Sequence, residues 1–287
     1  MSIVVSGGTG FIGRHLLHSL AGSGETVHAL VRPQSDTTSL PGGIVFHRID
    51  ETTDLAGLLA GLNPATCFHL ATRYQHAATP ADTPSLLQAN IVFATALADA
   101  ASRSGCHAFV NIGTASQMNA QGDYAPASLY AASKQAFEDI LAYFTQRAGL
   151  PAATVLLYDT YGPGDTRNKL LTQMIAAAKS GQRMALSPGE QEIDLVHVED
   201  VVEGLRAAAL ALSSGAPSPV RYTLSSGQPM SIRALAEEIS RAGKPVPADW
   251  NARPYRDGEV MTTWKGGTPP PGWRPRRRLA DYLRDSL

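Results

Sequence analysis

The chain of 287 residues is 44% hydrophobic and 17% charged, a balance that excludes intrinsic disorder, which needs fewer apolar residues and more net charge. Lys and Arg total 24 against 25 for Asp and Glu, so the net charge of −1 argues against nucleic acid as a partner. No apolar run approaches the roughly 18 residues of a membrane span, and no secretory signal precedes the first apolar run. We therefore expect a cytoplasmic protein with no membrane partner.

The two cysteines, Cys67 and Cys106, do not have the spacing of a metal site. A disulfide between them is not expected in a reducing compartment. We expect both thiols to be buried and inert, and no metal to be bound.

Short apolar runs alternate with longer segments of helical period along the first part of the chain. This alternation predicts βαβ units and an α/β fold, a Rossmann-type doubly wound parallel sheet with helices on both faces. The runs are continuously apolar, as expected for strands covered on both sides. The predicted strands are 3–6, 26–31, 44–48, 66–70, 109–112 and 154–157, and the predicted helices are 11–21, 54–62, 84–104 and 128–147.

From about Tyr161 the elements become shorter and are separated by Gly and Pro. We predict a dinucleotide-binding domain over 1–160 and a smaller, mainly substrate-binding region over 161–287, with some segments returning to the sheet. The run Arg276–Arg278 is interpreted as a solvated face before the last helix. The elements predicted in this region are helices 169–180, 199–212 and 231–242 and a strand at 222–224.

A glycine-rich turn lies where the first predicted strand meets the first predicted helix. Gly7 suits a turn conformation that a Cβ disfavours, Gly10 lets the backbone approach a pyrophosphate, and Gly13 lets the helix pack close to the sheet. The helix N-terminus presents unpaired N–H groups to the phosphates. The residues predicted to bind a dinucleotide here are Gly7, Thr9, Gly10, Phe11, Ile12 and Gly13.

The residue after the second predicted strand is Arg32, where a dinucleotide fold normally carries an acidic residue for the ribose 2′-hydroxyl. An arginine fork suits a 2′-phosphate, which a carboxylate would repel. This favours NADP(H) over NAD(H). Asp50, at the end of the third predicted strand, is interpreted either as an acceptor for the adenine amino group or as a helix cap.

Tyr130 and Lys134 lie four residues apart at the start of the predicted helix 128–147, so their side chains share one face. A free phenol has a pKa of about 10, too high for ready proton exchange near neutral pH. A neighbouring ammonium favours the phenolate, so we expect Lys134 to lower the pKa of Tyr130 and make it a general acid and base. Thr114 ends the fifth predicted strand, where α/β sheets assemble their sites, and is expected to hold the reacting oxygen.

Together these motifs resemble the extended short-chain dehydrogenase/reductase family, which contains nucleotide-sugar epimerases, dehydratases and ketoreductases. The resemblance covers nearly the whole chain. It includes the glycine turn, Tyr130-x-x-x-Lys134, His69-Leu70-Ala71, Asn90, Tyr161-Gly162-Pro163-Gly164-Asp165 and the segment 194–200.

The resemblance implies roles for particular residues. Leu70, Ala71 and Thr72 would line the cofactor's ribose and pyrophosphate, and Asn90 would belong to the same cofactor site. Lys134 would bind the nicotinamide ribose, Tyr130 would carry the proton, and Thr114 would occupy the family's catalytic Ser/Thr position. A homodimer through helices 84–104 and 128–147 is implied in the same way. His69 and His197 would be structural.

Within the family, the segments 159–162, 255–261 and 271–275 resemble CDP-abequose and CDP-paratose synthases, which reduce a 4-keto-6-deoxy sugar nucleotide. Asp159 replaces a frequent Asn, and Ile193 stands where many relatives place an Arg for the substrate diphosphate. Arg256, and less strongly Lys169, are the remaining candidates for that contact, so the predicted substrate residues are Thr114, Asp159, Lys169 and Arg256.

We expect an NADPH-dependent ketoreductase acting on a nucleotide-linked keto-deoxysugar, with the cofactor performing the hydride step. Dehydration is disfavoured because Ala115 and Ser116 stand where sugar-nucleotide 4,6-dehydratases carry an acidic pair. Two alternatives stay open. A 4-epimerase would retain tightly bound NAD, which Arg32 disfavours, and a non-catalytic dinucleotide sensor would commonly lack the Tyr and Lys found here.

Overall fold

The computed structural model describes residues 2–75 and 78–287 of the chain. Seven strands form one sheet in the order β11-β6-β5-β4-β1-β2-β3, and every neighbouring pair is parallel. The predicted doubly wound α/β fold is therefore confirmed. The strands are β1 (Ser2–Ser6), β2 (Thr26–Val31), β3 (Ile44–Arg48), β4 (Pro64–His69), β5 (Ala108–Thr114), β6 (Ala152–Leu157) and β11 (Val220–Leu224).

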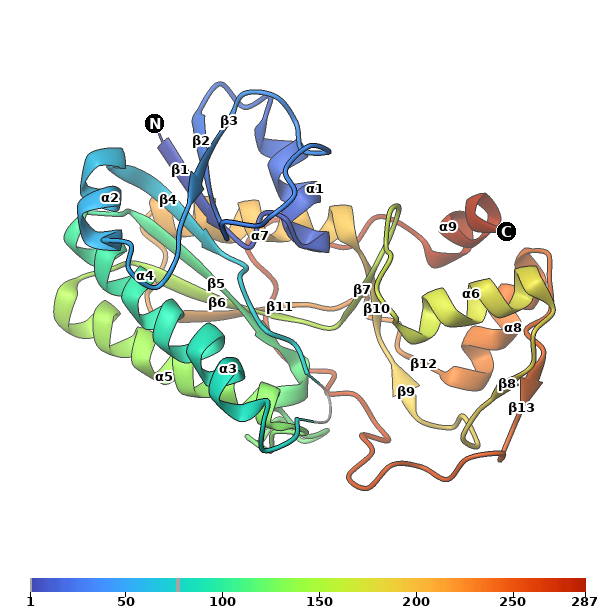
Figure 1. Cartoon of the computed structure of the whole chain (residues 1–287). Coiled ribbons are helices and arrows are strands. Elements are labelled where there is room, and N and C mark those ends of the chain that lie inside the picture. Colours follow the sequence, from blue (N-terminus) through green and yellow to red (C-terminus); the bar gives the residue numbers. More distant parts are fainter. Residues whose placement is uncertain (1, 76–77) are drawn as a thin grey trace.

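Helices cover both faces of this sheet (Figure 1). On one face α1 (Phe11–Leu20) and α7 (Val198–Ser213) pack their Leu and Val side chains against the strands. On the other face α2 (Leu55–Leu62), α4 (Phe93–Arg103) and α5 (Leu129–Ala148) form a second apolar cluster. The strands are buried on both sides, which explains their continuous apolar sequence.

The helix predicted over 84–104 is not continuous. It consists of α3 (Thr83–Leu87), a π-helical turn at Gln88–Val92, and α4. The π turn places Asn90 in the interior, where it is completely buried. Such turns interrupt the i, i+4 pattern by one residue and leave no signature in hydrophobic periodicity.

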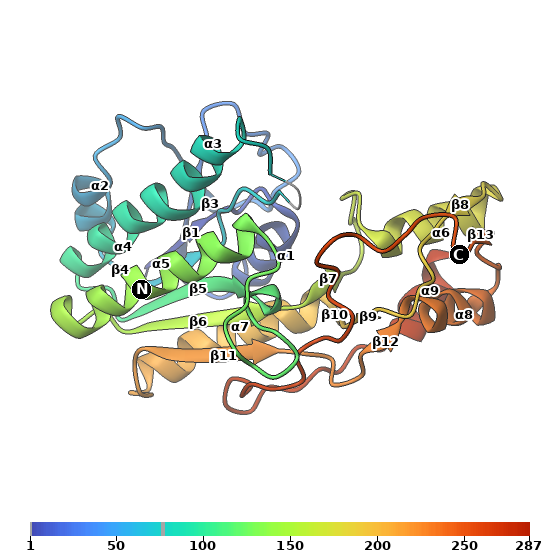
Figure 2. The same ribbon diagram turned by 90° about the horizontal axis from the view of Figure 1, so that it is seen from below.

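The second lobe is built from helices α6 (Leu170–Ser180), α8 (Ile232–Ala242) and α9 (Leu279–Ser286), which share a third apolar cluster. It also contains very short strand pairs that the sequence did not predict. These pairs are β7 (Asp159–Tyr161) with β10 (Leu195–His197), β9 (Glu192–Ile193) with β12 (Met230–Ser231), and β8 (Met184–Ala185) with β13 (Ala248–Asp249). Figure 2 shows the chain after α8 running back from this lobe to the sheet and returning to end in α9.

The C-terminal tail is anchored on α7. The Trp273 indole N–H donates to the Asp200 carbonyl at 2.8 Å, and the Arg277 guanidinium lies 2.6 Å from the Asp200 carboxylate and 3.1 Å from that of Glu203. The interpretation of Arg276–Arg278 as a solvated face is therefore wrong for Arg277, because its charge neutralises a buried carboxylate. Within the described ranges, no helix is both long and apolar enough to cross a bilayer.

Candidate active site

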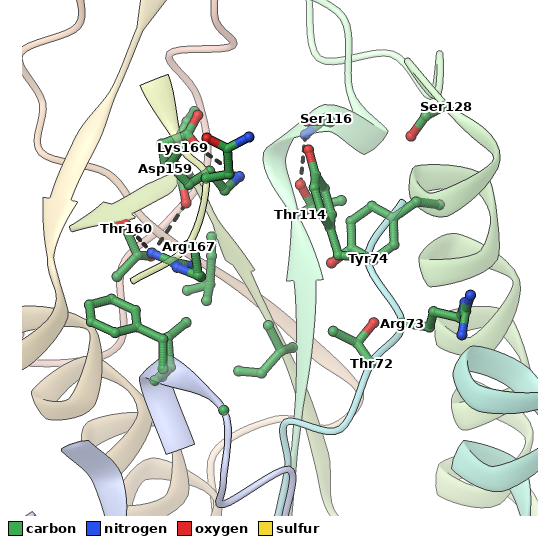
Figure 3. Close-up of a pocket in the computed structure, with 18 of the residues that line it drawn as sticks. Thr72, Arg73, Tyr74, Thr114, Ser116, Ser128, Asp159, Thr160, Arg167 and Lys169 are labelled. Carbon is green, nitrogen blue, oxygen red and sulfur yellow. Dashed lines mark hydrogen bonds and ion pairs between the residues drawn. The ribbon is translucent and has the colours of Figure 1, made fainter. Parts of the chain in front are cut away.

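A cavity of about 1930 Å³ lies between the two lobes, at the carboxyl ends of the sheet strands. A site for one small ligand occupies about 300–1000 Å³, so this cavity has room for two ligands side by side. Figure 3 shows Thr72, Tyr74 and Thr114 on the wall formed by the sheet lobe, facing Asp159, Arg167 and Lys169 on the opposite wall.

The glycine-rich turn forms one end of this cavity. Gly7 has φ 76°, and a Cβ there would lie 2.4 Å from the Ala71 nitrogen, while a Cβ at Gly13 would lie 2.2 Å from the Gly7 oxygen. A Cβ at Gly10 would meet only the Gly7 oxygen, at 3.3 Å, so this backbone is open toward the cavity. No side chain caps α1, and Thr9, Phe11 and Ile12 line the cavity with the three glycines. The turn thus fits a dinucleotide pyrophosphate, with α1 N–H groups available to its oxygens.

Arg32 lies in an exposed loop that also lines the cavity. The Arg48 guanidinium supports this loop from β3 by donating to the carbonyl oxygens of Pro33 and of Ser35. The lining residues that follow Arg32 are Pro33, Gln34 and Ser35, which bring no carboxylate. A ribose at this end would lie between the Arg32 loop and the wall that carries Asp50 and Glu51.

Asp50 lines the cavity across from this loop. Its Oδ1 accepts hydrogen bonds from the Thr52 N–H and hydroxyl and from the Thr53 hydroxyl, which lower the pKa of Asp50. The following helix is capped by Asp54 instead, which accepts from the Gly57 N–H. Asp50 is thus a turn cap at the cavity wall, and a contact with adenine stays a prediction.

Leu70, Ala71 and Thr72 leave the end of β4 and line the cavity, as the dinucleotide prediction requires. Asn90 does not line it. Its Oδ1 accepts from the Thr72 hydroxyl and the Arg73 N–H, and its Nδ2 donates to the Arg73 carbonyl and the Ser133 hydroxyl. Asn90 therefore supports the cavity wall from behind, and its predicted place among the cofactor contacts is corrected to a positioning role.

Tyr130 and Lys134 lie one turn apart on α5, which Ser128 caps by accepting from the Ala131 N–H. The half-buried phenol reaches the cavity, whereas Lys134 is only 1% exposed and lies behind the wall. Burial raises the pKa of Tyr130 to about 12, opposed by a hydrogen bond with Thr72 and reinforced by the charge of Tyr74. The pKa of Tyr130 is therefore raised and not lowered as predicted, and Lys134 is not among the causes of its shift.

Lys134 is itself strongly affected by its surroundings. Burial lowers the pKa of Lys134 to about 8, and the negative charge of Glu138 opposes that shift. The pKa of buried His69 falls to about 3 for the same reason, with a further contribution from the Lys134 charge. His69 is thus a neutral structural residue, bonded to the Ser6 hydroxyl at 2.8 Å.

Thr114 ends β5 at the cavity wall. Its Oγ1 accepts from the Ser116 N–H at 3.3 Å, which leaves the hydroxyl hydrogen available to a ligand. Its backbone N–H donates to Gln117 Oε1 at 2.9 Å, and Gln117 Nε2 donates to Gln135 and Glu138 on α5. Arg221 of β11 binds the same two α5 side chains. This network fixes the end of β5 against the helix that carries Tyr130.

The opposite wall presents charged side chains. Lys169 Nζ lies 3.2 Å from Asp159 Oδ1, and Arg167 donates to both carboxylate oxygens of Asp165 at 2.8 Å. The Arg167 guanidinium also lies 4.2 Å from the ring centroid of Phe11, so it joins the glycine turn to the second lobe. Arg256 and Ile193 line the same wall. Within the described residues, no group of His, Cys, Asp or Glu side chains could hold a metal.

The sequence profile of the NAD dependent epimerase/dehydratase family matches residues 3–222. The chain belongs to this family. It is therefore an enzyme of the NAD(P)-dependent oxidoreductase class, and the open glycine turn fits the nicotinamide dinucleotide that the family uses.

Individual relatives agree with the family assignment. The chain is 27% identical to the CDP-abequose synthase of Salmonella typhimurium over 275 residues, covering 90% of this chain and 87% of the relative. Among solved structures it is similar to MoeE5 in complex with UDP-glucose and NAD, at 25% identity and a TM-score of 0.83, covering 99% and 96% of the two chains. The fold also matches a UDP-N-acetylglucosamine 4-epimerase from Methanobrevibacter ruminantium, at 20% identity and a TM-score of 0.86 over 99% and 96%.

Sequence analysis did not identify two residues that line this cavity and contact predicted site residues, Tyr74 and Arg167. Tyr74 lines the cavity beside Tyr130, and Arg167 contacts Phe11. Each follows the end of a strand within a few residues of a predicted site residue, Thr72 and Lys169 respectively. That proximity is the signal that could have identified them.

Proposed function

We propose that this enzyme is an NADPH-dependent ketoreductase that reduces the 4-keto group of a nucleotide-linked 6-deoxyhexose. The observation that carries the proposal is a phenol and a hydroxyl, Tyr130 and Thr114, that line one cavity and each have a proton to donate. Burial raises the pKa of Tyr130 to about 12, so the phenol is protonated at neutral pH. A site that stabilises a developing alkoxide needs such donors.

Thr114 orients the substrate by donating its free hydroxyl hydrogen to the carbonyl oxygen, since its own oxygen accepts from Ser116. A dihydronicotinamide, when bound, would supply the hydride to the carbonyl carbon. Tyr130 gives its proton to the resulting oxygen, because an alkoxide is a stronger base than a phenolate.

Dehydration is not supported by the residues beside Thr114. Elimination of water needs an acid and a base near the sugar carbons, and Ala115 and Ser116 follow Thr114 directly and line the cavity. Neither side chain has a carboxylate. A carbonyl reduction needs no carboxylate: Tyr130 and Thr114 serve the oxygen, and a bound dihydronicotinamide would supply the hydride.

The substrate class is supported by the second wall and by the relative named above. Lys169 and Arg256 offer positive charge for a diphosphate. They could replace the Arg that many relatives carry at the position of Ile193. Asp159 beside Lys169 is an acceptor for a sugar hydroxyl. The similarity to CDP-abequose synthase over most of both chains favours a nucleotide-sugar substrate.

We expect the purified protein to oxidise NADPH in proportion to added nucleoside-diphosphate-4-keto-6-deoxyhexose, followed by absorbance of the reduced nicotinamide and by NMR of the sugar. Tyr130→Phe lacks the donor, so kcat falls by about 10²- to 10⁴-fold while the Kd for NADPH changes little. Tyr143→Phe is the matched control, because Tyr143 lies on the same helix and is 61% exposed. Conversion of the sugar without net NADPH oxidation would indicate a 4-epimerase instead.

Arg32 is proposed to select NADP(H) by pairing with the 2′-phosphate. Loss of a charged hydrogen bond weakens binding by about tenfold to a hundredfold, so Arg32→Gln raises the KM for NADPH by that factor and leaves the KM for NADH unchanged. Steady-state kinetics with both cofactors measures this. A parallel rise for the two cofactors would show that Arg32 does not read the phosphate.

The proposal also covers the roles of the two parts of the chain and the formation of a homodimer. Residues 1–160 hold the cofactor, and 161–287 supply most of the substrate wall. We propose a homodimer through residues 84–104 and 128–147, which contain α4 and α5, the helices that lie side by side on one face in Figure 1.

A further inference from the structure

Tyr74 has no role in the reaction as described so far, although its side chain adjoins Tyr130 in the cavity. It follows β4 by five residues and projects from the chain segment that also carries Thr72. Its side chain is 52% exposed, and it lines the cavity. Figure 3 shows it beside Thr114, on the wall opposite Lys169. A large aromatic ring that is neither buried nor on an outer surface suggests contact with a ligand.

The ring contacts groups from both lobes. Its centroid lies 5.0 Å from that of Tyr130, with the two rings at 78°, an edge-to-face arrangement. Lys169 Nζ lies 4.6 Å from the Tyr74 centroid, within the range of a cation–π interaction. Tyr74 thus adjoins the proposed proton donor on one side and the proposed diphosphate-binding cation on the other.

The backbone that carries Tyr74 is fixed relative to Tyr130. Both the N–H and the carbonyl of Arg73 are bonded to the buried Asn90 amide, at 2.7 Å and 3.1 Å. The same amide donates to the Ser133 hydroxyl, and Ser133 in turn donates to the Tyr130 carbonyl at 2.7 Å. One buried side chain therefore sets the positions of both tyrosines, as expected for residues that shape one subsite.

We propose that Tyr74 determines sugar specificity by forming the apolar wall against which the deoxygenated carbon of the substrate packs. This inference rests on the proposed ketoreductase function. A substrate whose carbonyl oxygen is held by Thr114 and Tyr130 would have its neighbouring sugar carbons beside the Tyr74 ring, because the centroid of that ring lies 5.0 Å from that of Tyr130. A methyl group gains contact with that ring, whereas a hydroxymethyl group loses water from its hydroxyl and finds an aromatic surface in place of a partner.

The discrimination between two substrates that an apolar wall can provide has an upper limit. A hydrophobic site rejects a substrate with one additional hydroxyl by about 10²-fold at most. We therefore expect a preference of about 10- to 100-fold in kcat/KM for the deoxysugar over the matching hydroxylated sugar. The ring, and not the phenol oxygen, produces this preference.

The test uses the reverse reaction, because both alcohol substrates are stable. Initial rates of NADP⁺ reduction are measured with a nucleoside-diphosphate-6-deoxyhexose and with the matching nucleoside-diphosphate-hexose. Wild type and Tyr74→Phe retain the preference, whereas Tyr74→Ser, which removes the apolar wall, reduces the ratio several-fold, with an unchanged Kd for NADPH. Tyr124→Ser is the control, the same change at a tyrosine that is 53% exposed on another loop.

The outcomes separate the two proposals. If wild type oxidises neither alcohol and reduces no keto sugar, the ketoreductase function fails and the role of Tyr74 fails with it. If wild type is active but Tyr74→Ser keeps the wild-type ratio, only the specificity role of Tyr74 is overturned. A Tyr74→Phe variant that loses the preference as fully as Tyr74→Ser would overturn the role of the ring, since it would assign selection to the hydroxyl.

Discussion

Tyr130 and Lys134 share one face of α5, but only the phenol reaches the cavity. The spacing of four residues predicts the shared face correctly because it depends only on helix geometry. It cannot predict the pKa of either group, because desolvation depends on residues distant in sequence. Thr72 and Tyr74 surround the phenol, and Glu138 acts on the ammonium. Local sequence thus identified the candidate residues, while their ionisation had to come from tertiary structure.

The buried ammonium predicts a pH dependence of stability. The pKa of Lys134 is lowered from 10.5 to about 8, so between these values the unfolded chain binds a proton that the folded protein has lost. The free energy of unfolding contributed by Lys134 therefore rises with pH in this interval, by at most about 1.4 kcal/mol per pH unit.

Urea unfolding of wild type and Lys134→Met at several pH values from 7.5 to 10 isolates this contribution, because other titrating groups are common to both proteins. We expect the stability of wild type relative to the variant to increase with pH. A difference that stays constant over the whole range would show that Lys134 has an ordinary pKa in the folded protein.

At the scale of elements, the alternation of apolar runs was sufficient to predict the sheet and its main helices. Strands β2 and β3 begin and end at the predicted residues, and α6 begins one residue later than predicted. The strands β7 to β10 were missed because two or three residues are too few to show a period. They matter to the site, since β7 carries Asp159 and β9 carries Ile193.

The junction of β5, α5 and β11 shows a second limit of sequence patterns. Arg221, on the edge strand β11, donates hydrogen bonds to Glu138 and Gln135 of α5. The Gln117 amide binds the same two side chains and accepts from the Thr114 N–H. The strand predicted over 222–224 did not include Arg221, which the structure places in β11. Only the strand order, with β11 beside β6, brings this cation to the helix that carries Tyr130.

At the scale of the whole molecule, the cavity depends on a tail that connects the lobes. The segment 253–264 lines the second wall, the carbonyl of Trp264 accepts from the Tyr158 hydroxyl, and Glu192 accepts from the Thr263 N–H. The tail then binds α7 through Trp273 and Arg277. Positioning of Arg256 in the cavity therefore requires an anchor beyond it, and the anchor is the buried Asp200.

This anchor leads to a prediction about stability. The Asp200 side chain is 0% exposed and the Arg277 side chain 33%, so Arg277→Met leaves a carboxylate buried with only backbone N–H donors. Breaking a buried pair in this way costs about 3–5 kcal/mol. Arg276→Met is the matched control, since the Arg276 side chain is exposed and its replacement should change the free energy of unfolding by no more than about 0.5 kcal/mol.

Urea unfolding of the two variants measures the difference, and Arg277→Lys separates charge from geometry. Lysine restores the charge but not the fork that reaches Asp200, Glu203 and Glu199 together, so we expect an intermediate loss. Because the tail carries Arg256, the KM for the sugar nucleotide should rise in Arg277→Met at temperatures where the protein is still folded. Equal stability of the Arg276 and Arg277 variants would mean that the tail is held by Trp273 alone, and the sequence-based interpretation of a solvated arginine run would then be correct in energetic terms.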